Sequence, residues 1–353
     1  MFTLALDGNG FIYAGGPFNT YNGVANSAHY LSKLNIATGA QVPISSSDVN
    51  TATGNGTNGA VYSIVIDATG NVYAGGLFTI SYVGGSGVAN NANRLLKLSP
   101  SGAIIKVNSA DVASPTGNGY SLSIFAMTLD LSGNLYVGGV FSSGCVGAVC
   151  YVQNGLAKIS ASGAYIKINP NDGVTSTSNG VSGPVWSLYS DRVGNLYVGG
   201  GISASYIGGS GVAGNSIGIL KINSAGTVVQ LSPNDTPGTT GNGVVGTVYT
   251  ITKDRLDNLY VGGAFSTVYF GGVKNLASHI VKLDPNGNLI KINSSDSLAT
   301  ATTNGFNNSY VYAILADKYN NMYICGDFVL SYIGGISTIV GKYIKITAAG
   351  LIK

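Results

Sequence analysis

The residue types that most often carry catalysis are scarce in this chain and show no catalytic spacing. Neither of the two histidines, His29 and His279, has a second histidine at the separation that metal ligands require. No Gly-x-Ser-x-Gly elbow follows a strand and opens a helix. Three aspartates outside the repeated columns, Asp257, Asp284 and Asp327, are the candidates for a carboxylate pair that hydrolyses glycosides. The sequence therefore predicts no catalytic, cofactor-binding or metal site.

Two of the three cysteines are close enough in sequence to form a disulfide. Cys145 and Cys150 stand in the segment SSGCVGAVCYV, inside a long connection. A bond between them would restrain that connection and indicate an oxidising compartment, whereas the alternative is two free thiols. The third cysteine, Cys325, replaces a glycine in a strand, and we expect it to be buried.

The composition indicates an all-β protein. Only 9% of the 353 residues are charged, against roughly 25% in an ordinary soluble protein. All 14 acidic residues are aspartate, so the chain lacks the glutamate that helical surfaces almost always use. The net charge of +3 is spread along the chain, so we expect no nucleic-acid partner. No apolar run reaches the roughly 18 residues of a spanning helix, so we expect no membrane insertion.

One unit of sequence occurs six times, once in every 60 to 63 residues. Each copy contains an aspartate, a tyrosine six residues after it, and an aromatic residue five residues before it, as in VYSIVIDATGNVYAGG and VWSLYSDRVGNLYVGG. Three columns aligned six times indicate a repeated structural unit. The columns are Asp7, Asp67, Asp130, Asp191, Asp254 and Asp317; Tyr13, Tyr73, Tyr136, Tyr197, Tyr260 and Tyr323; and Phe2, Tyr62, Phe125, Trp186, Tyr249 and Tyr312.

Each unit is predicted to form four short antiparallel strands. The first strand alternates, so that Tyr62, Ile64 and Ile66 share one face. The Asp-x-x-Gly-Asn after it is typical of a tight hairpin, in which aspartate accepts backbone N–H bonds and glycine or asparagine takes a positive φ. The third and fourth strands, such as LLKLS and AIIKVN, are joined by a second tight turn, such as SPSG.

Four-stranded units of this length, repeated four to eight times, are typical of a β-propeller. We therefore predict an all-β fold, a single six-bladed β-propeller over residues 1–353 with four antiparallel strands per blade. A right-handed β-solenoid is the competing fold, but it would need parallel rungs. A different phase, in which residues 1–16 complete a blade with the last strands, stays open. The predicted blades, joined by Gly/Ser/Thr/Asn-rich linkers, are roughly 1–44, 60–108, 122–169, 184–232, 247–293 and 309–353.

The first unit resembles the delta-sixty repeat of β-propeller proteins. Its segment GNGFIYAGGPFNTYNGVANSAHYLSKLN has the Gly-Gly-x-Phe core, the Tyr-Asn-Gly turn and the Lys-Leu-Asn strand of that repeat, and VWSLYSDRVGNLYVGG is similar to NHL-like propeller repeats. The chain lacks the usual Asp-x-Ser-Phe end and has a linker aspartate in its place. The resemblance covers nearly the whole chain and implies fold more than activity. It also implies an extracellular or virion-surface location, because such repeats are often found in virion, phage-tail and bacterial surface proteins.

Two further columns are explained by the repeat itself. An aspartate starts each of the five long linkers, and a lysine recurs in every third strand. A ring of calcium sites is the alternative, but the turns lack the dense oxygen ligands at alternate positions that calcium loops use. The aromatic column is expected to pack between blades and to dominate the core. The two columns are Asp48, Asp111, Asp172, Asp235 and Asp296, and Lys33, Lys97, Lys158, Lys221, Lys282 and Lys345.

The long connections are predicted to share one face of the propeller. They are rich in Tyr, Ser, Gly and Asn, a composition typical of adaptable binding surfaces, where tyrosine supplies contact area at low entropic cost. Five tyrosines recur there, mostly as Tyr-x-Gly-Gly, and are the candidate binding-face residues. The alternative is that their rings pack back on the blades and order the loops. They are Tyr21, Tyr82, Tyr206, Tyr269 and Tyr332.

A weakly charged face of this size is expected to associate with other molecules. We predict a non-enzymatic structural or surface protein that assembles with copies of itself, or with other shell or filament proteins of an extracellular or virion assembly, through its long-loop face. The alternative is a secreted lectin-like or adhesive module that recognises glycans or a receptor. A propeller lactonase, lyase or glycosidase is a third interpretation, and the missing catalytic residues make it the least favoured.

Overall fold

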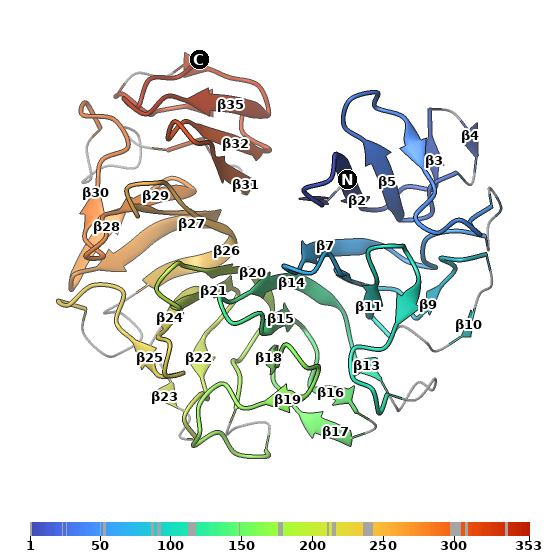
Figure 1. The fold of residues 1–353 in the computed structure, drawn as a ribbon. Coiled ribbons are helices and arrows are strands. Elements are labelled where there is room, and N and C mark those ends of the chain that lie inside the picture. Colours follow the sequence, from blue (N-terminus) through green and yellow to red (C-terminus); the bar gives the residue numbers. More distant parts are fainter. Residues whose placement is uncertain are drawn as a thin grey trace. The chain divides into compact units, whose positions relative to one another are not determined.

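The structure is a computed structural model in which every regular element of the described residues is a β-strand (Figure 1). The chain divides into two compact units, Met1–Ile168 with Val174–Ser176, and Asn169–Gly173 with Thr177–Lys353. We call them unit 1 and unit 2, and we number the six repeats in chain order. The described residues are 2–22, 24–25, 27–49, 51, 54–85, 88–89, 93–111, 118–147, 149–175, 179–209, 212–213, 217–235, 243–296, 305–307, 310–335 and 338–353.

Unit 1 contains three four-stranded antiparallel sheets, one for each of repeats 1 to 3. In each sheet the four strands lie side by side in chain order. The connection from the second strand to the third forms a separate two-stranded hairpin, which is described below. The strands are β1 (Thr3–Leu6), β2 (Phe11–Gly15), β5 (Leu31–Asn35) and β6 (Gln41–Val42); β7 (Val61–Ile66), β8 (Val72–Gly76), β11 (Leu95–Leu98) and β12 (Ile104–Ile105); and β14 (Ile124–Leu129), β15 (Leu135–Gly139), β18 (Leu156–Ile159) and β19 (Tyr165–Ile166).

Unit 2 contains the sheets of repeats 4 to 6. Repeat 5 has a fifth strand, β28, beside β27, and in repeat 6 the fourth strand is reduced to a bridge between Ile346 and Ile352. Every pair of named strands in the described part of the chain is antiparallel, and only an isolated bridge there, Ile217 with Gly243, is parallel. This pairing does not fit the parallel rungs of a β-solenoid. The strands are β20 (Val185–Ser190), β21 (Leu196–Gly200), β24 (Ile219–Ile222) and β25 (Val228–Val229); β26 (Gly243–Lys253), β27 (Leu259–Phe270), β28 (Val273–Leu276), β29 (Ile280–Leu283) and β30 (Leu289–Ile290); and β31 (Val311–Ala316), β32 (Met322–Gly326) and β35 (Tyr343–Ile346).

The connections between second and third strands are themselves β-hairpins (Figure 1). In repeat 3 the hairpin also pairs with a strand of the linker before it, and in repeat 5 it continues β27 into β28. The fourth strands are only two residues long, shorter than the predicted segments such as AIIKVN, because the chain leaves the sheet for the linker at that point. The hairpin strands are β3 (Thr20–Tyr21) and β4 (Val24–Ala25); β9 (Ile80–Ser81) and β10 (Val88–Ala89); β13 (Gly119–Tyr120), β16 (Ser143–Val146) and β17 (Val149–Val152); β22 (Ala204–Ser205) and β23 (Val212–Ala213); and β33 (Leu330–Ser331) and β34 (Thr338–Ile339).

The predicted turn chemistry of the first hairpin is confirmed. In repeat 2, Oδ1 of Asp67 accepts the backbone N–H groups of Thr69 and Asn71, both at 2.9 Å, and Oδ2 accepts the side-chain amide of Asn71 at 2.9 Å. The fourth turn residue has a positive φ in all six repeats. It is glycine in four repeats, and elsewhere it is Asp257 or Asn320, both with φ of 62°. Aspartate and asparagine tolerate this conformation better than other side chains.

A β-bulge in the first strand overturns the predicted alternation. In repeat 2, Val61 and Ser63 face consecutive residues of β8, so Tyr62 is the extra residue and has no partner across the pair. The same register shift occurs in repeats 3 to 6. A bulge re-aims the side chain of its extra residue, so the aromatic column leaves the buried core. Its rings contact one another between repeats instead, for example Phe2 with Tyr62 at 5.0 Å and Trp186 with Tyr249 at 6.0 Å between centroids.

Consecutive sheets of a unit pack against each other through the same positions each time. The forward face of a sheet, turned to the following sheet, carries the strand-two tyrosine and the first residue of strand three. The backward face, turned to the preceding sheet, carries the second and fourth residues after the aromatic column. Between repeats 5 and 6, Tyr260 and Ile280 of the forward face pack with Ile314 and Met322 of the backward face in one buried cluster. Equivalent clusters join repeats 1 and 2, 2 and 3, and 4 and 5.

The glycine two residues after the strand-two tyrosine sets how closely the sheets approach. A Cβ atom at Gly262 would lie 2.5 Å from Val311 Cγ1 and 2.9 Å from Ile314 Cδ1 of the next sheet. Cys325 takes this position in repeat 6, and it is exposed rather than buried as predicted. The reason is that repeat 6 is the last of unit 2, so the unit contains no following sheet to cover its forward face.

Gly262→Ala is expected to lower the free energy of unfolding by about 1–3 kcal/mol, because the added methyl group overpacks the contact with Val311. Gly341→Ala is the matched control, since a Cβ atom there meets nothing within 4 Å, and we expect a change within about 0.5 kcal/mol. Urea denaturation of the two variants checks this. Equal stability of both variants would show that the sheets are not in close contact at Gly262.

The lysine column is structural, as predicted. Each third-strand lysine lies over the ring of the strand-two tyrosine opposite it, with Nζ between 4.9 and 5.8 Å from the ring centroid. This geometry is a cation–π contact, worth roughly 0.5–2 kcal/mol depending on desolvation. The lysines therefore need no ligand to explain their recurrence.

Candidate binding surface

Each of the five linker aspartates ties the chain between two repeats to the hairpin of the following repeat. The Oδ1 atom accepts the N–H of a glycine 36 to 38 residues later, at 2.6–2.7 Å, and Oδ2 accepts the N–H of the residue three positions earlier. We call this arrangement the linker clamp. The clamped pairs are Asp48–Gly84, Asp111–Gly147, Asp172–Gly208, Asp235–Gly271 and Asp296–Gly334.

The clamps are mostly buried. Asp111, Asp172, Asp235 and Asp296 are all buried, whereas Asp48 is half-buried. Burial raises the pKa of Asp235 above its ordinary value, although hydrogen bonds from Ser232 and other backbone N–H groups lower it in part. A buried carboxylate that satisfies several backbone donors at once fixes both the linker and the hairpin.

In repeats 2, 4, 5 and 6 the clamped glycine is the third residue of the Tyr-x-Gly-Gly motif, so there the clamp also positions a candidate tyrosine. All five candidate tyrosines are half-buried. This exposure does not distinguish the predicted binding role from the alternative, in which the rings pack on the sheets. Among the described residues no ring contact joins any two of the five, so each stands separately on its own repeat. Three of them donate their backbone N–H to the carbonyl of a linker glycine: Tyr82 to Gly56 at 2.7 Å, Tyr206 to Gly180 at 2.9 Å and Tyr332 to Gly305 at 2.8 Å.

The other two candidate tyrosines are held differently. The hydroxyl of Tyr21 donates a hydrogen bond to the carbonyl of Gly39, in the turn before the fourth strand of its own repeat. Tyr269 lies near the end of the long strand β27, where it pairs with Lys274 of β28 and with Gly243 of β26. Both tyrosines therefore stand on ordered backbone, as the other three do.

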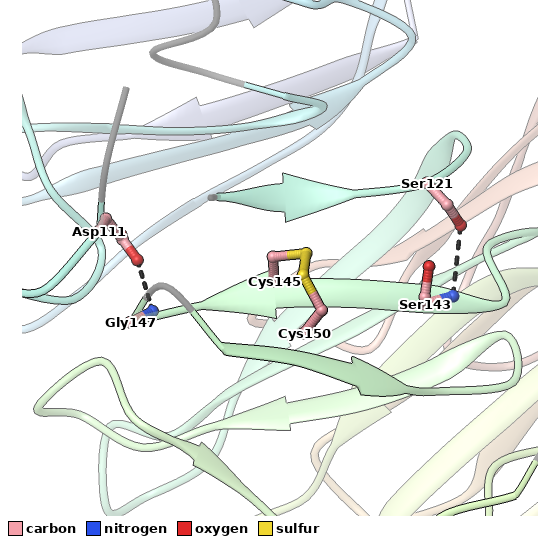
Figure 2. Close-up of a disulfide and its surroundings, with 6 residues drawn as sticks. All are labelled: Asp111, Ser121, Ser143, Cys145, Gly147 and Cys150. Atoms are coloured by element: carbon pink, nitrogen blue, oxygen red, sulfur yellow. Dashed lines mark hydrogen bonds between the residues drawn. A yellow bond between two sulfur atoms is a disulfide. The ribbon is translucent and has the colours of Figure 1, made fainter. Parts of the chain in front are cut away.

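In repeat 3 a disulfide stands where the other repeats have this tyrosine. Cys145 of β16 faces Cys150 of β17, with 2.01 Å between the sulfur atoms and 3.9 Å between Cα atoms (Figure 2). At the tip of the hairpin, Asp111 accepts the N–H of Gly147 at 2.6 Å, and at its base Ser121 Oγ accepts the N–H of Ser143 at 3.2 Å (Figure 2). The disulfide thus restrains a hairpin that is already held at both ends.

Peptide mapping without reductant is expected to recover Cys145 and Cys150 in one cross-linked peptide. Cys325 is exposed and free, so it should be the cysteine that iodoacetamide modifies in the folded protein. Modification of Cys145 or Cys150 before reduction would contradict the disulfide.

Shallow hollows lie beside the clamps. One of about 140 Å³, between β12 and the β16–β17 hairpin, is lined by Ile104, Lys106, Asp111 and Cys145 among others. Asp111 is committed to the clamp there, and Lys106 donates to the carbonyl of Ser109 at 3.2 Å. A similar hollow lies beside Asp48, so the feature belongs to the repeat.

A more polar hollow, of about 260 Å³, lies at the first-hairpin turns of repeats 4 to 6 in unit 2. Its lining includes Arg192, Lys253, Arg255 and Lys318, together with aspartates of the same turns. Lys253 forms a buried ion pair with Asp191 at 3.0 Å, and its Nζ lies 4.9 Å from the centroid of the Tyr197 ring. Three aspartates of the lining, together with Asp191 on Lys253, match the four cations in number.

Of the three non-repeat aspartates, Asp257 and Asp284 line one small hollow together, with Lys221 and Lys253. Asp257 occupies a positive-φ turn position, and Asp284 accepts the N–H groups of Asn286 at 2.9 Å and Asn288 at 2.8 Å in its own turn. Asp327 is exposed and accepts a hydrogen bond from the Tyr312 hydroxyl at 2.7 Å. A hydrogen bond from Tyr312, and then one from Lys342, lower the pKa of Asp327 below its ordinary value.

The two histidines have local structural roles. The backbone N–H of His29 donates to Asn55 Oδ1 at 3.1 Å, which ties repeat 1 to the following linker. His279 has a φ of 67°, at a position where repeats 3 and 4 have glycine. Burial lowers the pKa of both imidazoles.

Across the described ranges, no three His, Cys, Asp or Glu side chains are placed to hold a metal ion together. The same residues include no helix long and apolar enough to cross a membrane.

No protein-family model matches this chain, and no curated protein matches it. The resemblance to delta-sixty and NHL-like repeats therefore stays a prediction. Among solved structures, a streptogramin B lyase is 14% identical, with a TM-score of 0.48 over 100% of this chain and 81% of that one. PorZ, a surface component of the type-IX secretion system of Porphyromonas gingivalis, is 15% identical, with a TM-score of 0.48 over 97% of this chain and 37% of that one.

A third similar structure is the extracellular domain of a putative one component system from B. thetaiotaomicron. It is 12% identical, with a TM-score of 0.48 over 99% of this chain and 32% of that one. The chain thus spans about a third of the length of two of these proteins. Likenesses at this level of identity and TM-score assign no function.

Proposed function

We propose that this chain is a non-enzymatic structural or surface protein, whose six sheets are the blades of a β-propeller. Its long-loop face would join it to copies of itself or to shell proteins of an extracellular or virion assembly. The observation that carries the proposal is the linker clamp, which occurs at all five linkers and fixes the hairpins of repeats 2 to 6. A surface ordered before binding loses little entropy when it binds.

Two further features support the proposal. Four of the recurring tyrosines, Tyr82, Tyr206, Tyr269 and Tyr332, are half-buried on these fixed hairpins, so part of each ring stays available for contact. The Cys145–Cys150 disulfide is of a kind that persists outside the reducing cytosol, which supports an extracellular location.

The test compares two sets of tyrosine substitutions by light scattering. Replacing Tyr206, Tyr269 and Tyr332 together with serine should lower the average particle mass, because it removes three rings from the loop face of unit 2. Tyr319→Ser is the matched control, since that exposed tyrosine lies on a first-hairpin turn. An unchanged mass in the triple variant would contradict the role of the loop face.

Glycan recognition is the second candidate, and one cluster of unit 2 favours it. Tyr310 and Tyr312 are half-exposed rings 6.0 Å apart, and Asp327 and Lys342 border them. Exposed rings beside polar groups that can bond hydroxyls suit a sugar ring. Binding on a glycan array that Tyr312→Ser abolishes would support this function, and an array without binding would contradict it.

A further inference from the structure

Three first-hairpin turns of unit 2 carry a cation that the turns of unit 1 lack. The second residue of this turn is basic in repeats 4 to 6 and uncharged in repeats 1 to 3. In repeats 2 and 3 the turn aspartate makes its usual hydrogen bonds without that charge, for example from the N–H of Asn134 to Asp130 at 2.9 Å. The repeat therefore does not explain the three cations. The basic set, which we call the turn cations, is Arg192, Arg255 and Lys318, and the other set is Gly8, Ala68 and Leu131.

The turn cations line one polar hollow of unit 2. They all border the hollow of about 260 Å³, and they are all exposed. Among the described residues none of them forms an ion pair, whereas Lys253 of the same hollow is paired with Asp191. Nζ of Lys318 lies 5.1 Å from the centroid of the Tyr319 ring, and this contact leaves its N–H groups able to donate hydrogen bonds. The chain has three arginines, so two of the three stand at this hollow.

The aspartates of the hollow match the cations in number, but most of them are engaged in their own turns. Oδ1 of Asp254 accepts the backbone N–H groups of Leu256 and Asn258 at 2.9 and 3.0 Å, and Oδ2 accepts the side-chain amide of Asn258 at 2.8 Å. Asp317 makes the equivalent bonds in the turn of repeat 6. Asp257 differs, because its carboxylate has no hydrogen bond or ion pair within the described part of the chain. The hollow therefore offers three cations with donors to spare and one uncommitted carboxylate.

We propose that this hollow binds a phosphate or sulfate group through Arg192, Arg255 and Lys318. A guanidinium group presents two parallel N–H donors that fit two oxygens of such a group, and an ammonium adds a further charge. The backbone N–H of Arg255 donates to Oδ1 of Asn320 at 2.9 Å, which joins the turns of repeats 5 and 6. Binding on turns already fixed in this way costs little ordering. The site goes beyond the proposed assembly, because it lies at the first-hairpin turns and not on the long-loop face.

Isothermal titration calorimetry with three probes tests the site and the source of its ligand. Inorganic phosphate should bind the wild-type protein if the free ion is the ligand, and dextran sulfate alone should bind if the group is recognised on a polysaccharide. Unsulfated dextran should not bind, because it carries no oxyanion. A wild-type protein that binds neither phosphate nor dextran sulfate, or binds dextran as tightly as dextran sulfate, would overturn the site.

Arg192→Gln and Arg255→Gln are each expected to weaken binding of the same probe about ten-fold or more, because a hydrogen bond to a charged group is worth about that factor. Lys274→Gln is the matched control, since Lys274 is exposed on β28, outside the lining of the hollow, and its loss changes the net charge equally. The control should bind like the wild type. Equal weakening by all three variants would show a general effect of charge and would overturn the site.

Asp257→Asn is expected to tighten binding several-fold, because it removes the carboxylate that repels an anion at the hollow. Asparagine accepts the positive φ of this position, as Asn320 does in repeat 6 with φ of 62°. Misfolding cannot produce tighter binding, so this variant tests the site even where another substitution lowers stability. Unchanged or weaker binding by Asp257→Asn would overturn the site. The particle mass of these variants should equal that of the wild type, so failure of the site leaves the proposed assembly standing.

Discussion

Asp191→Ala is expected to lower the free energy of unfolding by about 4 kcal/mol, because it leaves the Lys253 ammonium buried without its carboxylate partner. The two side chains are 2% and 10% exposed, and their charged atoms are 3.0 Å apart. Asp191 also accepts the N–H of Asn195 at 2.8 Å, so its turn is weakened as well. Urea denaturation, with the slope of the transition compared between variants, measures the loss.

Asp67→Ala is the matched control, because Asp67 holds the same turn in repeat 2 and forms no ion pair among the described residues. It should cost only about 1–2 kcal/mol, the value of its hydrogen bonds. Similar losses in the two variants would show that the ion pair with Lys253 contributes nothing.

The same ion pair predicts a dependence on pH. Burial raises the pKa of Asp191. Hydrogen bonds from Asn195 and Lys253 lower the pKa by more than burial raises it, so the pKa lies below its ordinary value. Ionised Asp191 therefore stabilises the fold above about pH 4, and this stability is lost as the pH falls through the lowered pKa. Asp191→Ala should lose stability less steeply in acid than the wild type, and parallel curves would contradict the shift.

Asp235→Ala is expected to lower the free energy of unfolding by about 3 kcal/mol, because it removes a linker clamp. The N–H groups of Ser232 and Gly271, which donate to Asp235 at 2.9 and 2.6 Å, would lose their acceptor in a buried site. Each buried donor left without a partner costs roughly 1–3 kcal/mol. Thermal and urea unfolding of the variant check the value.

Asp48→Ala is the control for burial, since Asp48 makes the same clamp with Gly84 but is half-buried. Water can replace part of its hydrogen bonding, so its loss should be smaller, about 1–2 kcal/mol. A loss at Asp48 equal to or above that at Asp235 would contradict the view that burial gives the clamp its strength.

Much of the local structure could be predicted from sequence because it depends on short-range chemistry. Asp-x-x-Gly-Asn requires a turn whose fourth residue has a positive φ, and the structure has that turn in every repeat, even where Asp257 or Asn320 replaces glycine. Four antiparallel strands per repeat follow from two such turns, and they are present in repeats 1 to 5.

The bulge at the aromatic column could not be predicted from alternation alone. A period of two cannot show that one extra residue is inserted opposite a single partner, so strict alternation wrongly predicts Tyr62 on the face of Ile64. Cys325 was expected to be buried for a related reason: a glycine position is closed only where a following sheet packs on it. Strand patterns describe one sheet, whereas these features depend on its neighbour.

The linker clamp has a signature in the sequence that the repeat analysis alone does not reveal. The sequence contains an aspartate column, namely Asp48, Asp111, Asp172, Asp235 and Asp296, and a Tyr-x-Gly-Gly motif, but periodicity alone does not connect the two. The constant separation of 36 to 38 residues between each aspartate and its glycine is the feature that links the two. A fixed spacing between two polar columns in a repeat protein is therefore a sign of a contact.

The particle mass in solution tests most directly whether this chain assembles with copies of itself, as we propose. Light scattering at micromolar concentration should give a mass that is a multiple of 35.8 kDa and rises with protein concentration. A mass of 35.8 kDa that stays constant across the concentration range would contradict the claim.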